Sequence, residues 1–86
     1  MPTPDLDDIQ RSILAFICRH IPPDANPPVF ETRNTICGEL RLALHEYDQA
    51  CMGLTRQRLI VTDPPYANDC DFIAPTPAGR AIIHHP

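Results

Sequence analysis

The sequence predicts a small α+β domain in which helices precede and follow a β-hairpin. Two segments, residues 5–21 and 34–58, repeat apolar residues at spacings of three and four, the period of a helix with one buried face. Two short runs of β-branched and other apolar residues, Leu59–Thr62 and Asp71–Ala74, flank a stretch of turn residues, which is typical of a hairpin. With 86 residues, the chain is expected to form one domain (1–86), which excludes a two-domain enzyme.

Residues 5–21 are expected to form the first helix. Its apolar side chains fall on one broad stripe: Leu6, Ile9, Ile13, Phe16, Ile17 and His20. Thr3 or Asp5 can cap its start, because either side chain accepts a hydrogen bond from a free amide of the first turn.

A proline-rich segment separates this helix from the next. Pro22 and Pro23 end the helix, since a proline disfavours helical geometry in the residue before it. Residues 22–28 are expected to form a stiff connector, and a brief extended piece follows at Val29–Phe30.

The second helical pattern begins at Asn34 or Thr35 and continues to Arg58. Its apolar stripe consists of Ile36, Leu40, Ala43, Leu44, Tyr47, Cys51 and Leu54. The pattern fits one helix of about six turns or two helices joined by a compact turn. We favour a break near Arg41–Leu44, because so small a domain would have trouble burying one helix of that length.

The hairpin and a last helix complete the chain. Residues 63–70 would form a long hairpin tip, because prolines, Asn and Asp fill this stretch. Thr76 is expected to cap the last helix, and Pro77 suits its first position. The buried face of this helix would consist of Ala81, Ile82 and Ile83.

Four cysteines, Cys18, Cys37, Cys51 and Cys70, are too far apart for the close Cys-x-x-Cys pairs of structural zinc sites. We expect no metal site, and four small buried residues instead, since free cysteine is among the most buried residue types. The chain lacks a glycine-rich phosphate loop and a nucleophile motif, so we expect no cofactor and no enzyme. It also lacks a secretion signal and a long apolar run, which indicates a cytoplasmic protein without a membrane segment.

The order of elements and two local patterns resemble the winged helix-turn-helix family of DNA-binding domains. The first pattern is the helical stretch Ile13–Ile21, a proline-rich gap that contains Pro27–Pro28, and a second helical stretch that ends in residues 53–60, Gly-Leu-Thr-Arg-Gln-Arg-Leu-Ile. It is similar to the N-terminal domains of SOS-response repressors. The second is residues 72–80, Phe-Ile-Ala-Pro-Thr-Pro-Ala-Gly-Arg, which look like the end of a wing strand and the start of a terminal helix. The patterns together span nearly the whole chain.

The resemblance implies a winged helix-turn-helix with three helices, a two-stranded β-hairpin wing and a C-terminal helix. Residues 35–41 would be the positioning helix, 45–58 the recognition helix that enters the major groove, and 59–74 the wing. The bases would be read by His45, Glu46, Asp48, Gln49 and Met52. The remaining DNA contacts would come from the backbone amides of Asn34 and Thr35 and from Arg41, Arg56 and Arg58.

Several of these residues also have a purely structural interpretation. Arg56 and Arg58 follow the end of a helix, where a cation complements the helix dipole without any ligand. For Glu46 and Asp48 we favour the acidic first turn of a helix over base reading. Tyr47 lies on the apolar stripe, and we expect it in the core.

The chain departs from the family pattern in its turn and in its charge. The expected turn, residues 41–44, contains no glycine to adopt a positive φ. The expected wing contains three aspartates and no basic residue, and the net charge of the chain is −4. Residues 31–58 carry four acidic and four basic side chains, so this segment has no basic excess to attract a polyanion.

Two functions are consistent with these patterns. The element order favours a small DNA-binding transcriptional regulator of the phage or mobile-element type, which binds double-stranded DNA as a homodimer. The acidic charge favours the alternative, a winged-helix module that binds another protein and no DNA. Tyr66, an aromatic residue in the expected wing tip, is the candidate contact for such a protein partner.

Overall fold

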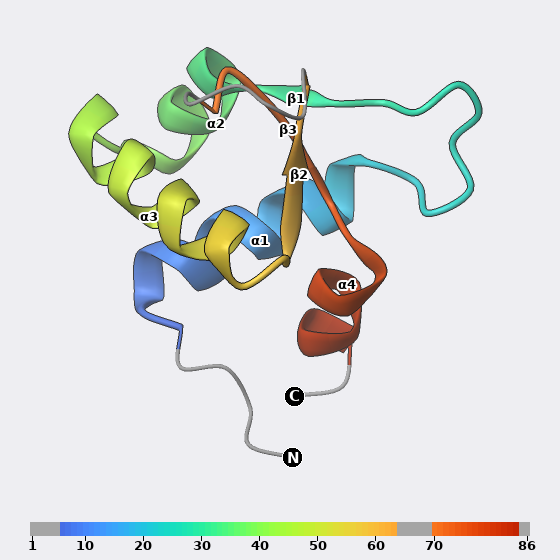
Figure 1. The fold of residues 1–86 in the computed structure, drawn as a ribbon. Helices are drawn as coiled ribbons and strands as arrows, with labels where there is room; N and C mark the ends of the chain where they lie inside the picture. The colour runs from blue at the N-terminus through green and yellow to red at the C-terminus, as the bar shows by residue number, and fades with distance from the viewer. Residues whose placement is uncertain (1–5, 64–69, 85–86) are drawn as a thin grey trace.

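The computed structural model describes residues 6–63 and 70–84, which form four helices and a three-stranded antiparallel sheet (Figure 1). The helices are α1 (Asp8–His20), α2 (Arg33–Leu40), α3 (Leu44–Arg56) and α4 (Pro77–His84). The strands are β1 (Glu31–Thr32), β2 (Ile60–Thr62) and β3 (Phe72–Pro75), in the spatial order β1–β3–β2. The prediction of an α+β fold with four helices and an antiparallel strand pair is confirmed within these residues.

The first helix begins at a capping box. The Asp7 carboxylate accepts a hydrogen bond from the Gln10 amide at 2.7 Å, and the Gln10 side chain accepts one from the Asp7 amide at 3.1 Å. The cap was expected at Thr3 or Asp5, which lie outside the described residues. Because α1 begins at Asp8, its N-cap is Asp7. The helix ends at His20, one residue before the expected end, because Ile21, which precedes the proline pair, is extended.

The long helical pattern is divided into two helices, which confirms the break expected near Arg41–Leu44. Arg41 follows α2 with a φ of 55°, in the left-handed region. The Leu42 amide then donates to the Cys37 carbonyl at 3.0 Å, which closes the end of α2. The turn contains no glycine, as the sequence shows, and Arg41 itself adopts the positive φ.

The sheet contains a third strand, β1, in addition to the two strands of the expected hairpin. The extended piece expected at Val29–Phe30 lies two residues later, as β1. Its Glu31 pairs with Ile73 of β3, and Thr62 of β2 pairs with the same residue from the other side. The expected two-stranded wing is therefore part of a three-stranded sheet, with β3 in the centre.

The core lies between α1, α3 and the sheet, and α1 packs against both α3 and α4 (Figure 1). The largest fully buried side chains are Tyr47, Ile13, Leu14, Ile17, Ile36, Leu54, Ile73 and Cys51. All four cysteines are buried, as expected. Thr76 caps α4, as expected, because its hydroxyl oxygen accepts from the Gly79 amide at 3.1 Å.

Some positions on the predicted stripes are exposed. Ala43 and Leu44 lie in solvent because the turn after α2 resets the helical phase, so a stripe continued from α2 misses the core. Ala81 is exposed, whereas Gly79 is the buried residue of α4. His20 is exposed and stacks on Phe16, with 4.2 Å between the ring centroids. Among the described residues, no helix combines the length and the apolar content that crossing a bilayer requires.

Candidate functional site

The outward face of α3 carries a stripe of exposed polar and apolar side chains. Its members, separated by four, three and four positions, are His45, Gln49, Met52 and Arg56. The opposite face of the same helix is buried and consists of Tyr47, Ala50, Cys51 and Leu54. A helix repeats every 3.6 residues, so the four exposed side chains lie in one row along the side that faces away from the core. We call this row the outward stripe.

The two carboxylates of the first half of α3 are engaged within the protein. The Glu46 side chain accepts a hydrogen bond from the Ala43 amide at 3.0 Å and so caps its own helix. Asp48 forms an ion pair with Arg33, with 2.7 Å between Oδ2 and Nη2. The outward stripe itself contains no carboxylate. Glu46 and Asp48 therefore both have a structural role, which was the alternative to base reading for these two residues.

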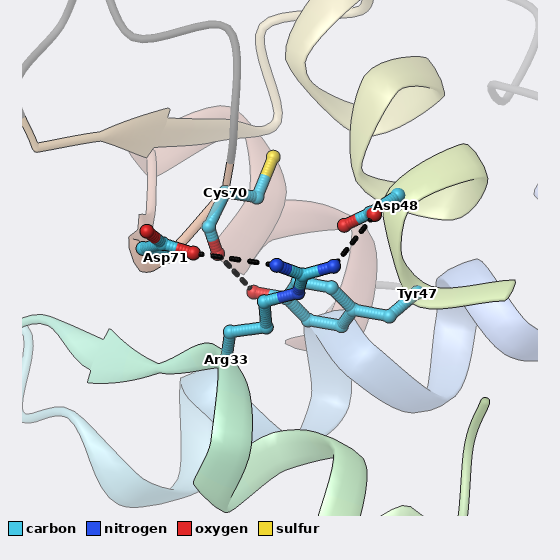
Figure 2. Close-up of polar contacts among 5 residues, drawn as sticks. All are labelled: Arg33, Tyr47, Asp48, Cys70 and Asp71. Atoms are coloured by element: carbon cyan, nitrogen blue, oxygen red, sulfur yellow. Dashed lines mark hydrogen bonds and ion pairs between the residues drawn. The ribbon is translucent and has the colours of Figure 1, made fainter. Parts of the chain in front are cut away.

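Arg33 joins three elements at one point (Figure 2). It lies at the start of α2, and its guanidinium reaches Asp48 of α3 and, at 3.6 Å, the Asp71 carboxylate just before β3. The Arg33 amide also donates to the Asp71 carbonyl at 2.9 Å. Within the described residues, the buried Nε of Arg33 has no hydrogen-bond partner. These contacts fix the orientation of α3 relative to α2 and the sheet.

Tyr47 reinforces the same junction from inside the core. Its hydroxyl donates to the Cys70 carbonyl at 2.6 Å, which ties α3 to the residues that lead into β3 (Figure 2). Burial raises the pKa of Tyr47 far above its ordinary value. A hydrogen bond with the Cys70 side chain, together with burial, raises the pKa of Cys51. Both groups are therefore protonated at neutral pH, and the Cys51 thiol is a poor nucleophile.

Two arginines with positive φ flank α3. Arg41 precedes the helix with a φ of 55°, and Arg58 follows it with a φ of 60°. Both side chains are exposed. The Arg58 amide donates to Thr55 and the Leu59 amide to Leu54, each at 3.0 Å, which is the hydrogen-bond pattern of a helix end that glycine usually closes.

The start of α2 has fewer free amides than the resemblance implies. Thr32 caps the helix, and its hydroxyl oxygen accepts from the Thr35 amide at 3.3 Å. The Arg33 amide is bound to Asp71, as described above. In the part of the chain that the structure describes, only Asn34 of the first three residues of α2 has an amide without an acceptor. Asn34 and Thr35 are both exposed, at the base of α2.

The predicted site residues therefore fall into three groups. His45, Gln49 and Arg56 lie together on the outward stripe, and Arg41 and Arg58 lie beyond its two ends. Asn34 and Thr35 lie at the other end of α2 from Arg41. Tyr66, the candidate contact for a protein partner, lies outside the described residues.

Sequence reasoning missed Arg33 as the residue that holds these elements together. Its partners are 15 and 38 positions away, so no local spacing or motif connects them. The sequence offered one weak indication of these ion pairs. Arg33 lies where a helix begins, and Asp48 and Asp71 have no oppositely charged residue at helical spacing.

A second surface feature is an apolar groove of about 400 Å³ between the proline-rich segment, β2, β3 and α4. Its walls include Pro23, Val29 and Val61, and its charged residue is Arg80. Arg80 donates to the Ile21 carbonyl at 2.8 Å and to the Cys18 carbonyl at 3.4 Å, so it ties α4 to the end of α1. The described residues contain no group of His, Cys, Asp and Glu side chains that could hold a metal ion.

Comparison with protein-family models gives no match for this chain. The curated proteins and the solved structures give no match either. The outward stripe of α3 and its flanking arginines are exposed and make no contribution to the core, so their side chains are free to contact a partner.

Proposed function

We propose that this chain is a small winged-helix DNA-binding transcriptional regulator of the phage or mobile-element type. In this proposal α2 and α3 form the helix-turn-helix, α3 enters the major groove of double-stranded DNA, and β2 and β3 form the wing. The observation that carries the proposal is the outward stripe of α3, an exposed row of hydrogen-bonding and apolar side chains without a carboxylate. Such a row matches the donors, acceptors and methyl groups of base edges.

The distribution of charge supports the proposal better than the net charge suggests. Asp48 and Asp71 are paired with Arg33, and Glu46 caps α3, so these acids are held by partners within the fold. Arg41 and Arg58 lie at the two ends of α3, and Arg56 lies on the stripe. No carboxylate of residues 6–63 or 70–84 forms an ion pair with any of these three arginines. They are therefore available to phosphate oxygens on either side of a groove.

The number of available arginines supports binding as a homodimer. A specific DNA-binding protein commonly neutralises about 6 to 10 phosphates. Three arginines per chain, together with the Asn34 amide, reach that range only when two chains bind adjacent half-sites. We therefore propose a homodimer on a site with two-fold symmetry.

Charge reversal at the end of α3 tests the proposal. The double variant Arg56→Glu, Arg58→Glu is expected to lose duplex binding, measured by fluorescence anisotropy at low salt, while its far-ultraviolet circular dichroism stays unchanged. The double variant Arg11→Glu, Arg19→Glu is the matched control, because both are exposed arginines of α1, outside the proposed helix-turn-helix, and the same number of charges is reversed. Equal binding by the double variant and the unmodified chain would contradict the proposal.

One observation favours the second candidate function, a winged-helix module that binds a protein. Leu44 and Met52 of α3 are 52% and 55% exposed, and large apolar side chains in solvent are typical of protein-binding surfaces as well as of base contacts. In this case a partner protein would be captured by the unmodified chain and not by the variant Leu44→Ala, Met52→Asp. The Arg56→Glu, Arg58→Glu variant would capture it equally well, which separates the two functions.

A further inference from the structure

Met52 has no structural reason to be apolar. It lies in the middle of the outward stripe with 55% of its surface exposed, and the core contacts of α3 are made by the opposite face. Gln49, three positions before it, and Arg56, four positions after it, are both exposed. A large apolar side chain in water gains free energy when a partner removes it from solvent. Met52 is therefore suited to contact an apolar group, with polar contacts on both sides.

The major groove of DNA offers one kind of apolar group at the base edges. Adenine, guanine and cytosine present hydrogen-bond donors and acceptors there, whereas thymine adds its C5-methyl group. A methionine side chain donates no hydrogen bond and its sulfur accepts only weakly, so Met52 cannot read the polar positions. Its chemistry matches the methyl group of thymine.

Gln49 fits the same base pair or its neighbour. Side chains three positions apart on a helix have their Cβ atoms about 5–6 Å from each other, and successive base pairs are about 3.4 Å apart. The amide of Gln49 can donate to and accept from one adenine edge at the same time. Gln49 and Met52 together therefore match an A·T pair, or two adjoining ones, through the adenine edge and the thymine methyl.

We propose that Met52 is a specificity-determining residue that contacts thymine methyl groups, so that the recognised duplex has A·T pairs opposite the centre of α3. The inference rests on the proposed DNA-binding function and adds to it the base class that the helix selects. Arg56, one turn further along the stripe, is placed for a guanine edge or a phosphate beyond these pairs.

Deoxyuridine substitution tests the contact directly, because it removes the C5-methyl group and keeps the base pairing. A preferred duplex is first selected from a randomised pool with the unmodified chain, and each thymine is then replaced singly. We expect one or two positions at which the Kd rises about fourfold, the effect of one buried methyl-sized group. In Met52→Ala, whose exposed position should leave the fold intact, these positions are expected to become insensitive to the replacement.

Two controls separate this contact from its neighbours. Gln49→Ala should bind more weakly and keep the sensitivity to deoxyuridine. Val29→Ala, which changes an exposed apolar residue outside the proposed helix-turn-helix and wing, should change neither. Binding of the pool without sequence preference, or sensitivity that persists in Met52→Ala, would overturn the inference and leave DNA binding standing. Failure to bind any duplex at low salt would overturn both the inference and the proposed function.

Discussion

At two positions the backbone takes a conformation that glycine adopts most easily, and at both the residue is arginine. Arg41 and Arg58 have φ values of 55° and 60°, and both side chains are exposed, so neither packs in the core. A side chain in the left-handed region costs about 1–2 kcal/mol. Residues that keep such strain are found preferentially at binding sites, which agrees with the proposed phosphate contacts at the two ends of α3.

Replacing these arginines by glycine should separate stability from binding. Arg41→Gly and Arg58→Gly are each expected to raise the free energy of unfolding by about 0.5–1 kcal/mol, because relief of strain exceeds the added chain entropy of glycine. Both should weaken duplex binding. Urea denaturation and anisotropy measure the two effects, and Arg41→Lys is the control that keeps both the charge and the strain. A loss of stability in the glycine variants would refute the strain argument.

The buried hydroxyl of Tyr47 contributes to stability through its hydrogen bond. Tyr47→Phe removes the donor to the Cys70 carbonyl at the buried junction of α3 and β3. We expect the free energy of unfolding to fall by about 1–3 kcal/mol, the usual cost of removing one partner of a buried hydrogen bond. Urea denaturation checks this, and an unchanged midpoint would mean that the hydrogen bond contributes nothing.

At the scale of elements, α4 depends on a close approach to the segment that precedes β2. A Cβ added to Gly79 would meet the Leu59 carbonyl oxygen and the Leu14 side chain. The backbone carbonyl cannot move away without displacing β2, so α4 packs here only because residue 79 has no side chain. Gly38 of α2, in contrast, has open space where a Cβ would stand.

These two glycines form a matched pair. Gly79→Ala is expected to lower the free energy of unfolding by about 1–3 kcal/mol through overpacking. Gly38→Ala should raise it by about 0.5–1 kcal/mol, because alanine favours the helix and meets no neighbour. Thermal unfolding of both variants gives the comparison. Opposite signs are expected, and a stabilised Gly79→Ala would show that α4 does not pack as described.

The elements that were predicted correctly are those whose signal is local. Apolar periodicity and proline positions located α1, the hairpin strands and α4, and the size of the domain argued for the break between α2 and α3. The extended piece was expected two residues too early because Glu31 and Thr32 carry no alternation. Its place in the sheet was missed because the pairing partners, Ile73 and Phe72, are some 40 positions away. The Arg33 ion pairs were missed for the same reason. The positive φ of Arg41 was missed because glycine is the residue type from which such a conformation is normally predicted.

For the whole molecule, the buried thiols and Tyr47 predict a loss of stability at alkaline pH. Burial raises the pKa of Cys18 and Cys37, and the hydrogen bond with Cys70 together with burial raises that of Cys51. An unfolded thiol loses its proton near pH 8.5, whereas the folded protein keeps these protons to higher pH. The unfolded state then binds fewer protons, so the free energy of unfolding falls as the pH rises above about 8.5.

The expected slope is up to about 1.4 kcal/mol per pH unit for each such group. Urea denaturation under reducing conditions at a series of pH values measures it. Cys51→Ala, which removes one titrating group, should give a shallower decline above pH 8.5 from a lower starting stability. A stability that stays constant up to pH 10 would contradict the assignment of these thiols as buried and protonated.

The net charge of the whole molecule opposes the proposed DNA binding. A net charge of −4 repels a polyanion on average, and only the local arrangement around α3 opposes that repulsion. If Arg41, Arg56 and Arg58 contact phosphates, binding must weaken steeply with salt, because each contact releases counterions.

The measurement is fluorescence anisotropy of a labelled randomised duplex pool, titrated with the chain from low to physiological salt, with the size of the complex determined by light scattering. We predict binding at low salt, a linear fall of log K with log salt, and a slope reduced by about one unit per bound chain in Arg41→Ala. Absence of binding at the lowest salt, or a slope unaffected by that substitution, would contradict DNA recognition by this surface.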